Sequence, residues 1–167
     1  MSEIHVKYQN FGQVGVMGDN ASYYNPQKGK VYLAGSSKRA DLVSYVAKKL
    51  KLNCYPWWED FRRNPSPSEW RKYADADLYY IKQAELLVAF WDPTAPSYGV
   101  MFELGRSKHK NVVVVLGDRG SIEVPESFFL SASDFIGRLV FVPKDDSCPI
   151  EYIDRICEAV ETVIREA

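Results

Sequence analysis

Histidine and cysteine are scarce in this sequence of 167 residues. The 2 histidines, His5 and His109, lie outside any segment expected to border a cleft. A histidine-based catalytic dyad and a metal site are therefore not predicted, and no cofactor is expected. The 3 cysteines, Cys54, Cys148 and Cys157, are an odd number without metal-binding spacing. They are expected to be reduced thiols, as in a cytoplasmic protein.

Long apolar runs and an excess of charge of one sign are also missing. No run reaches the roughly 18 apolar residues of a membrane span, and no cationic segment precedes a shorter apolar one, so neither a span nor a signal peptide is predicted. The net charge is -1, with no basic run beyond residues 108–110, which argues against nucleic acid as a partner. Apolar residues at 46% and charged residues at 26% are typical of one globular domain with its own core.

The first 29 residues differ from the rest of the chain. Gly12, Gly15 and Gly18 recur at every third position among Asn, Gln and Tyr, almost without charge. A disordered tail or a short hairpin against the domain would account for this composition. The alternative is a strand segment that assembles with copies of itself, since low charge with Val, Tyr and Asn suits stacked strands. We expect residues 1–25 to matter for assembly rather than chemistry, and residues 30–167 to form the domain.

From residue 30 onward, strand and helix patterns alternate. Short runs rich in β-branched and aromatic residues predict five strands, at 30–34, 53–58, 86–91, 112–116 and 138–143. Helical patterns separate the first four strands, and a last helix is expected from about residue 149 to 166. The order favours an α/β fold: a doubly wound, parallel, five-stranded sheet of flavodoxin-like order with helices on both faces.

One carboxylate lies in an unusual place beside the third predicted strand. Residues 92–99, beginning with Asp92, follow that strand, and ligands of parallel sheets bind beyond the carboxyl ends of the strands. The next helix is expected to hold Glu103 in about its first turn, where backbone N–H groups would keep the pKa of this carboxyl low. An ionised Glu103 at a cleft is a candidate nucleophile. Alternatively, it only complements the helix dipole on a solvated face.

A second acid interrupts an apolar helix face. In the helix that Ser68 is expected to cap, Asp77 falls on the same stripe as Trp70, Tyr73, Ala74, Ile81 and Ala84. Burial there would raise the pKa of Asp77 towards that of a proton donor. The alternatives are that Asp77 caps a neighbouring loop or that the helical register is shifted by one residue.

The turn Gly35-Ser36-Ser37 joins the first strand to the first helix. Backbone N–H groups at such a helix start bind phosphate or sugar oxygens readily, although Ser is also a common N-cap. Aromatic residues make up 14% of the chain, and those nearest the expected cleft are candidates to stack on a planar base: Trp57, Trp58 and Tyr98.

Three blocks of sequence carry a family resemblance: VYLAGS at 31–36, DLYYIKQAELLVA at 77–89 and PSYGVMFELGRS at 96–107. They resemble the nucleoside 2-deoxyribosyltransferase family, and especially its deoxynucleoside monophosphate N-glycosidase branch. The resemblance implies that Glu103 is the nucleophile and that Asp77 orients or protonates the leaving base. It implies sugar or phosphate binding by Ser97 and Gly99 and by the first loop. It also implies a homo-oligomer whose pockets are completed by neighbouring subunits.

The predicted activity is cleavage or transfer at the N-glycosidic bond of a small-molecule nucleoside or nucleotide. Two alternatives remain. The GSS turn with a later FELG block is also similar to TIR-like domains of bacterial antiphage defence that cleave NAD, and the N-terminal glycine pattern is similar to amyloid-signalling motifs of bacterial immune effectors. The other alternative is a non-catalytic nucleotide-sensing or assembly module.

Overall fold

The described part of the chain folds around one parallel sheet. The structure, a computed structural model, describes residues 31–63, 65–107, 111–121 and 136–167. Its strands are β1 (Val31–Ala34), β2 (Leu86–Trp91), β3 (Asn111–Val115) and β4 (Ile136–Phe141). They are ordered β1-β2-β3-β4 and every neighbouring pair is parallel. The α/β class and four of the five predicted strands are thus confirmed, whereas residues 1–29 lie outside the described residues.

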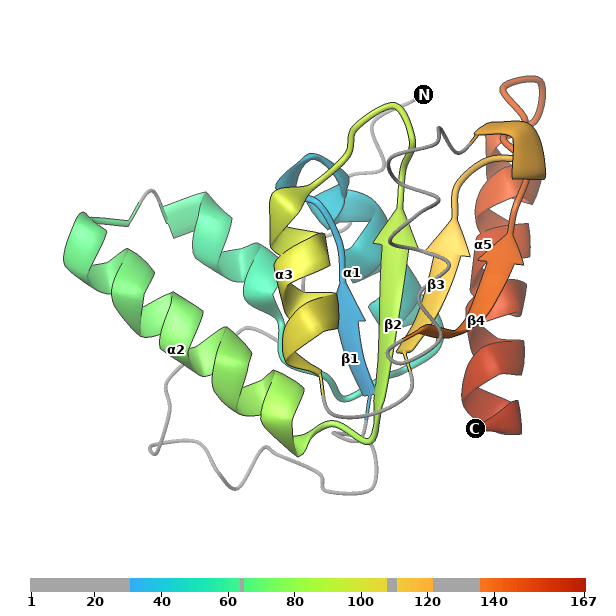
Figure 1. Cartoon of the computed structure of the whole chain (residues 1–167). Coiled ribbons are helices and arrows are strands. Elements are labelled where there is room, and N and C mark those ends of the chain that lie inside the picture. Colours follow the sequence, from blue (N-terminus) through green and yellow to red (C-terminus); the bar gives the residue numbers. More distant parts are fainter. Residues whose placement is uncertain (1–30, 64, 108–110, 122–135) are drawn as a thin grey trace.

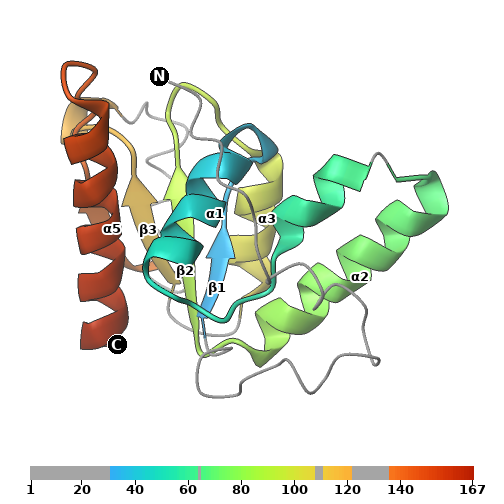
Figure 2. The ribbon, with the colours of Figure 1, turned by 180° about the vertical axis from the view of Figure 1, so that it is seen from behind.

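Helices cover both faces of this sheet. The α-helices are α1 (Ala40–Lys49), α2 (Pro67–Gln83), α3 (Tyr98–Arg106) and α5 (Pro149–Glu166), with short 3₁₀ helices η3 (Ser37–Arg39), η4 (Trp57–Arg63) and η5 (Arg119–Ser121). Figures 1 and 2 show α1 and α5 on one face and α3 on the other, with α2 extending beyond the β1 edge beside α3. None of the helices in the described residues is long and apolar enough to cross a membrane.

The strand positions follow from apolar runs that are covered on both sides. Every residue of β1, β2 and β3 is buried, as expected for strands between two layers of helices. In β4, an edge strand among the described residues, Ile136 is the one buried residue. The sheet therefore forms the centre of the core, and functional side chains must lie at its ends or between the covering helices.

Residues 53–58 do not form the predicted fifth strand, so that prediction was wrong. Residues 53–56 are irregular and Trp57 begins η4. Pro56 has no N–H for a ladder of hydrogen bonds, which disfavours a strand with neighbours. The aromatic residues that indicated a strand are instead buried in the core, where Trp57 Nε1 donates a hydrogen bond to the Leu33 carbonyl at 2.6 Å. The four described strands lie side by side in chain order, and the outer strand of the predicted flavodoxin-like order is missing among the described residues.

Helix α2 begins earlier than predicted. Ser66, not Ser68, is the N-cap: its side chain accepts from the Glu69 N–H, and the Glu69 side chain accepts from the Ser66 N–H. Pro67 follows at the first helical position, where its missing N–H costs nothing. The apolar stripe differs in part as well, because Tyr73 and Ile81 are buried whereas Trp70 and Ala74 are exposed.

Candidate active site

Helices α2 and α3 bring two carboxyl groups to one buried position beside β1. The two helices pack against each other, with Asp77 on α2 and Glu103 on α3. The Tyr32 hydroxyl of β1 donates a hydrogen bond to Glu103 Oε1 at 3.3 Å. This bond lowers the pKa of Glu103, and Tyr32 also lowers the pKa of Asp77. Three elements thus converge on a site with two acids and one phenol.

Both acids have raised pKa values. Burial is the main cause, and it raises the pKa of Asp77 to about 8, with a further contribution from the charge of Asp60. Burial followed by the charge of Asp77 raises the pKa of Glu103 to about 8. Because two neighbouring carboxyl groups cannot both ionise cheaply, the pair as a unit holds a proton near neutral pH.

The expectation for Glu103 was wrong in one respect. No acidic residue lies in the first turn of α3, which begins at Tyr98, and Glu103 lies further along the helix. The backbone N–H groups of the helix start are therefore out of reach of Glu103, and loss of hydration on burial dominates the shift of its pKa. For Asp77, the pKa is raised, which is the direction expected for an acid on a buried face.

Asp77 is left without full hydrogen bonding. Its Oδ1 atom is buried and has no hydrogen-bond partner in the described part of the chain. No described lysine or arginine forms an ion pair with Asp77 or Glu103. A buried polar atom without a partner costs about 1–3 kcal/mol, so such atoms are usually paired unless a ligand or water completes them. The position of Oδ1 is therefore suited to a substrate group.

A cavity of about 410 Å³ lies against Asp77, between η4 and α2. Its lining residues are Trp57, Asp60, Trp70, Tyr73, Ala74 and Asp77. Trp70 and Ala74, which were predicted to be buried on α2 but are exposed, thus form part of the cavity wall. The volume lies in the range of small-molecule sites, and three aromatic rings in the wall suit a flat, apolar-faced ligand such as a nucleobase.

Trp57 and Trp58 have different environments. Trp57 lines the cavity, while Trp58 is fully buried and packs edge-on against Trp57, with ring centroids 5.8 Å apart. The hydrogen bond from Trp57 to Leu33 fixes the ring of Trp57 against β1. Of the two neighbouring tryptophans, Trp57 is thus the one placed to touch a ligand, and Trp58 supports it from behind.

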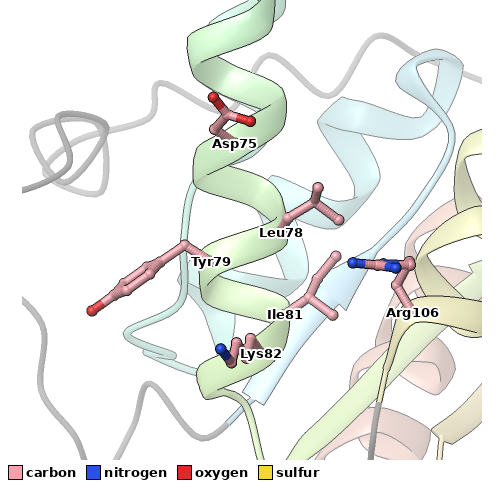
Figure 3. Close-up of a pocket in the computed structure, with 6 residues that line it drawn as sticks. All are labelled: Asp75, Leu78, Tyr79, Ile81, Lys82 and Arg106. Atoms are coloured by element: carbon pink, nitrogen blue, oxygen red, sulfur yellow. The ribbon is translucent and has the colours of Figure 1, made fainter.

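A smaller cavity of about 240 Å³ lies on a different face of α2. Figure 3 shows Leu78 and Ile81 projecting from α2 towards Arg106 at the end of α3, while Tyr79 projects away. Asp75 and Lys82 complete the lining. None of the residues predicted for the site borders this cavity, so it provides positions for control substitutions.

The predicted oxygen-binding loops lie beyond β1 and β2. Residues 35–37 follow β1 and residues 92–99 follow β2. Because the two strands are parallel, both loops lie beyond the carboxyl ends of the strands, at the same end of the sheet. In the first loop, a Cβ atom on Gly35 would lie 2.7 Å from Val43 Cγ2, so the close packing of α1 on this turn requires glycine. Ser36 caps η3 by accepting from the Lys38 N–H at 3.2 Å, and Ser37 is exposed.

The second loop leads into α3. The Ser97 side chain caps α3 by accepting from the Val100 N–H at 3.3 Å, and a Cβ atom on Gly99 would lie 3.5 Å from the Ser97 Oγ atom. Since each serine cap acts as an acceptor, its own hydroxyl hydrogen is not used in these bonds and is able to point to a ligand. Tyr98 is 96% exposed and has no buried contact surface of its own.

Asp92 lies at the same edge but in a different electrostatic state. Its carboxylate forms an ion pair with Arg39 of η3 and accepts two hydrogen bonds from Thr94, from the hydroxyl at 2.6 Å and from the backbone N–H at 2.9 Å. Burial by itself would raise the pKa of Asp92, but the bonds from Thr94 and then Arg39 outweigh it and lower the pKa. Asp92 is thus held as an anion that ties the two loops together.

Two residues of the site were missed from the sequence. Tyr32 was interpreted as a core position of the first strand, and Asp60 as part of a charged loop. The signal for Tyr32 was available, because a phenol in a fully buried strand needs a hydrogen-bond partner. Asp60 had no such signal, since only the fold of η4 reveals that this acid is 3% exposed. Among the described residues, no group of three or more His, Cys, Asp and Glu side chains is arranged to hold a metal ion.

The fold is that of an α/β protein with a parallel sheet, and two acids with raised pKa values lie on adjacent helices beside it. The chain belongs to the nucleoside 2-deoxyribosyltransferase family, whose model matches residues 31–161. No curated protein and no solved structure gives a match to the chain. The family is generally enzymatic, and its description indicates transfer of deoxyribosyl groups between nucleosides.

Proposed function

We propose that the protein cleaves or transfers the N-glycosidic bond of a nucleoside or nucleotide, with Glu103 as nucleophile and Asp77 as proton donor. The observation that carries the proposal is the convergence of two acids with raised pKa values, of which Glu103 accepts a hydrogen bond from Tyr32 and Asp77 lines an aromatic cavity of base size. Membership of the family supports the same reaction class. The two alternatives, an NAD-cleaving defence effector and a non-catalytic module, have no such support.

The proposed reaction needs one proton on the pair of acids. In that state Asp77 is neutral and able to donate, while Glu103 is ionised and able to attack. Loss of negative charge on Asp77 also removes the repulsion that raises the pKa of Glu103. A single proton therefore separates the two roles.

In the first step, the bond between the anomeric carbon and the base breaks. Its electron pair stays on the base, which takes the proton from Asp77, and a Glu103 oxygen bonds to the anomeric carbon. In the second step, water or another base attacks this carbon and releases Glu103, while the ionised Asp77 accepts the attacking group's proton. Two inversions give overall retention, as in two-carboxylate glycosidases.

The cavity walls and loops supply binding. Trp57, Trp70 and Tyr73 would hold the base between aromatic surfaces, with Trp58 behind Trp57. Oxygens of the sugar or a phosphate would contact the two loops at the sheet edge through Gly35, Ser36, Ser37, Ser97 and Gly99, with Tyr98 beside them and Asp92 fixing the loops. This part of the proposal rests on the position of both loops beyond β1 and β2.

The test is a substrate panel for the full chain. Nucleosides, deoxynucleoside monophosphates and NAD are incubated with the wild type and with Asp77→Asn, and free base is measured by chromatography. We expect release of a purine or pyrimidine from at least one deoxynucleoside or deoxynucleotide. Asp77→Asn should slow that release far more than any release of nicotinamide, which leaves without protonation. Absence of base release from every substrate would refute the proposal.

We further propose that the enzyme works as a homo-oligomer. Two large apolar side chains on α3, Tyr98 and Phe102, are 96% and 58% exposed and would be covered by a neighbouring copy. Light scattering across a dilution series, with activity measured in parallel, tests this idea. A strict monomer with full activity at every concentration contradicts it.

A further inference from the structure

The two acids of the candidate site are alike in one respect that the proposed reaction cannot tolerate. Burial, with neighbouring charges, raises the pKa of both Asp77 and Glu103 to about 8. Two equivalent acids would share one proton equally, but only the form with neutral Asp77 and ionised Glu103 matches the proposed roles. A difference in the surroundings of the two acids must therefore decide where the proton lies.

Asp60 of η4 is a buried acid on the Asp77 side of the pair. Asp60 is 3% exposed and lines the aromatic cavity together with Asp77, whereas Glu103 is not among the described residues that line it. After burial, the charge of Asp60 is the next cause that raises the pKa of Asp77, while the charge that raises the pKa of Glu103 is that of Asp77. A negative charge beside one of two acids disfavours ionisation of that acid.

The Asp60 carboxylate is held in place by Tyr55. Its Oδ2 atom accepts a hydrogen bond from the Tyr55 hydroxyl at 2.9 Å. The Tyr55 ring stacks on Tyr80 of α2, with centroids 4.4 Å apart and ring planes inclined by 10°. Burial, followed by the charge of Asp60, raises the pKa of Tyr55, so the phenol keeps its proton and remains a donor. Because a hydrogen bond to a carboxylate favours the ionised form, Tyr55 supports the negative charge of Asp60.

Asp60 has a further interaction besides the bond from Tyr55. The sign of its effect on Asp77 does not depend on the other groups that Asp60 contacts. Removal of a negative charge from a position near Asp77 favours ionisation of Asp77, whether or not that charge was itself paired.

The other titratable groups around Asp77 favour the same distribution of the proton or leave it unchanged. Tyr32 of β1 lowers the pKa of Asp77, but burial and the charge of Asp60 outweigh this effect. The hydrogen bond printed by the geometry runs from Tyr32 to Glu103 on α3, at 3.3 Å, and it favours the ionised form of Glu103. Tyr55 acts near Asp77 as a neutral phenol. Asp60 is thus the group that distinguishes Asp77 from Glu103 by charge.

We propose that Asp60 is a positioning residue that places the shared proton on Asp77 and so assigns the roles of donor and nucleophile within the pair. The inference rests on the proposed function for the reaction in which these roles are used. Asp60 does not touch the bond that breaks, and it acts through its charge on Asp77. Once Asp77 has given its proton to the base, the repulsion from Asp60 makes the Asp77 carboxylate a stronger base for the proton of the attacking group in the second step.

The first experiment locates the proton without turnover. The full chain is labelled with carbon-13 at the carboxyl carbons of Asp and Glu, and the NMR signals of Asp77 and Glu103 are identified as those missing in Asp77→Asn and Glu103→Gln. At pH 7 we expect a neutral carboxyl group at Asp77 and a carboxylate at Glu103. In Asp60→Asn, the titration midpoint of Asp77 should fall by about 0.5–1 pH unit and that of Glu103 should rise.

Two further variants accompany Asp60→Asn. Tyr55→Phe removes the donor to Asp60 but keeps the aromatic ring, and it should move the midpoint of Asp77 in the same direction by a smaller amount. The matched control is Asp75→Asn, which makes the same change on α2. Asp75 is exposed and lines the other cavity, shown in Figure 3, so its substitution should leave both midpoints where they are in the wild type.

The second experiment is the pH–rate profile of the full chain on its best substrate. Activity needs the proton on Asp77, so kcat/KM should fall on the basic side as this proton is lost. In Asp60→Asn the basic limb should move to lower pH, which reduces kcat/KM above the limb by about three- to tenfold. The acidic limb, which reports ionisation of Glu103, should move less. A merely structural role for Asp60 would lower the whole profile without moving its basic limb.

Each outcome separates this inference from the proposed function. A wild type that holds the proton on Glu103 at pH 7 overturns the inference, even if Asp60→Asn does not fold. An unmoved midpoint of Asp77 in folded Asp60→Asn also overturns it, and base release by the wild type would then leave the proposed function intact. A lowered midpoint without cleavage of any substrate by the wild type would refute the proposed function and leave the placement of the proton intact.

Discussion

Asp92 and the pair Asp77–Glu103 are acids of the same fold in opposite environments. Asp92 has Arg39 and Thr94 as partners, and its pKa is lowered. Asp77 and Glu103 have each other, a single phenol and no ion pair within the described residues, and their pKa values are raised to about 8. Burial raises the pKa of all three acids, so the hydrogen bonds and charges around each acid decide the direction of its net shift.

The difference lies in which partners the fold supplies. Where a carboxylate ties two loops together, the surrounding groups stabilise its charge. A carboxyl group that changes protonation during a reaction has to stay incompletely compensated, because full compensation would fix it in one state. The contrast is what we expect if Asp77 and Glu103 are the reactive pair, as proposed, and Asp92 is a positioning group.

The largest effect is expected from the nucleophile. Glu103→Gln keeps the size and the hydrogen bond from Tyr32 but removes the charge, so base release should fall by at least about a thousandfold. Glu158→Gln, at an exposed position of α5, serves as control and should leave activity unchanged. Wild-type turnover in Glu103→Gln would refute the assignment of the nucleophile and with it the comparison above.

A smaller effect is expected from Tyr32→Phe. Because the Tyr32 hydroxyl lowers the pKa of Glu103 and Asp77, its loss should raise both further and leave less ionised Glu103 at neutral pH. We expect kcat/KM at pH 7 to fall about 10- to 100-fold, with the acidic limb of the pH–rate profile moving to higher pH. Tyr79→Phe, on the exposed side of α2, should not move the profile. An unmoved acidic limb in Tyr32→Phe would contradict this role.

The Asp92 site can be tested through its cation. Arg39→Met keeps the aliphatic stem but leaves a buried carboxylate without its ion pair, and we expect a loss of about 2 kcal/mol in the free energy of unfolding, reduced because Arg39 is partly exposed. Arg155→Met removes the exposed pair with Asp145 and should cost clearly less, because solvent screens that pair. The unfolding free energies of both variants are measured by denaturant titration. Equal losses would mean that Arg39 stabilises the charge of Asp92 no more than an exposed ion pair would.

Neutralising Asp77 or Glu103 should have the opposite effect on stability. Since the folded-state pKa values of Asp77 and Glu103 exceed their ordinary values near 4, the folded state binds more protons between about pH 4 and 8. Stability due to these groups therefore falls as the pH rises through that window. Asp77→Asn and Glu103→Gln should each raise the free energy of unfolding by about 0.5–2 kcal/mol above pH 8, and by less at pH 5. Destabilisation at pH 9 in both variants would argue against uncompensated acids.

The smallest effect is expected from removal of residues 1–28. Both acid sites lie within the matched residues 31–161, so a chain that starts at Gly29 should keep base release and the pH profile of the full chain. The composition of the segment predicts a loss of self-assembly instead, measured by thioflavin binding. A large drop in melting temperature, with no fibres from either chain, would show that the segment is part of the fold.

Much of the fold could be predicted because its signals are local. The runs at β2 and β3 are buried throughout, so their apolar character reports their place directly. The strand predicted at 53–58 was wrong because aromatic residues, which are enriched in strands, also pack irregular segments on a core, and only Pro56 argued against pairing.

The site was predictable at the level of its acids but not of their environment. Asp77 was identified because it broke an apolar pattern, and its raised pKa followed from burial. For Glu103, the expected pKa depended on where α3 begins, and a shift of the helix start by one turn reversed the sign. Asp60 and Tyr32 join the site only through contacts between segments far apart in the chain.

The hydrogen bond from Trp57 to Leu33 also bears on how the molecule avoids aggregation. Among the four described strands, β1 lies at one border of the sheet, and a border strand with unused backbone groups is a template for pairing with another chain. Here an indole, rather than a fifth strand, occupies one such carbonyl. The same ring lines the aromatic cavity, so a substitution that enlarges this cavity at Trp57 would also expose the border strand and should lower solubility.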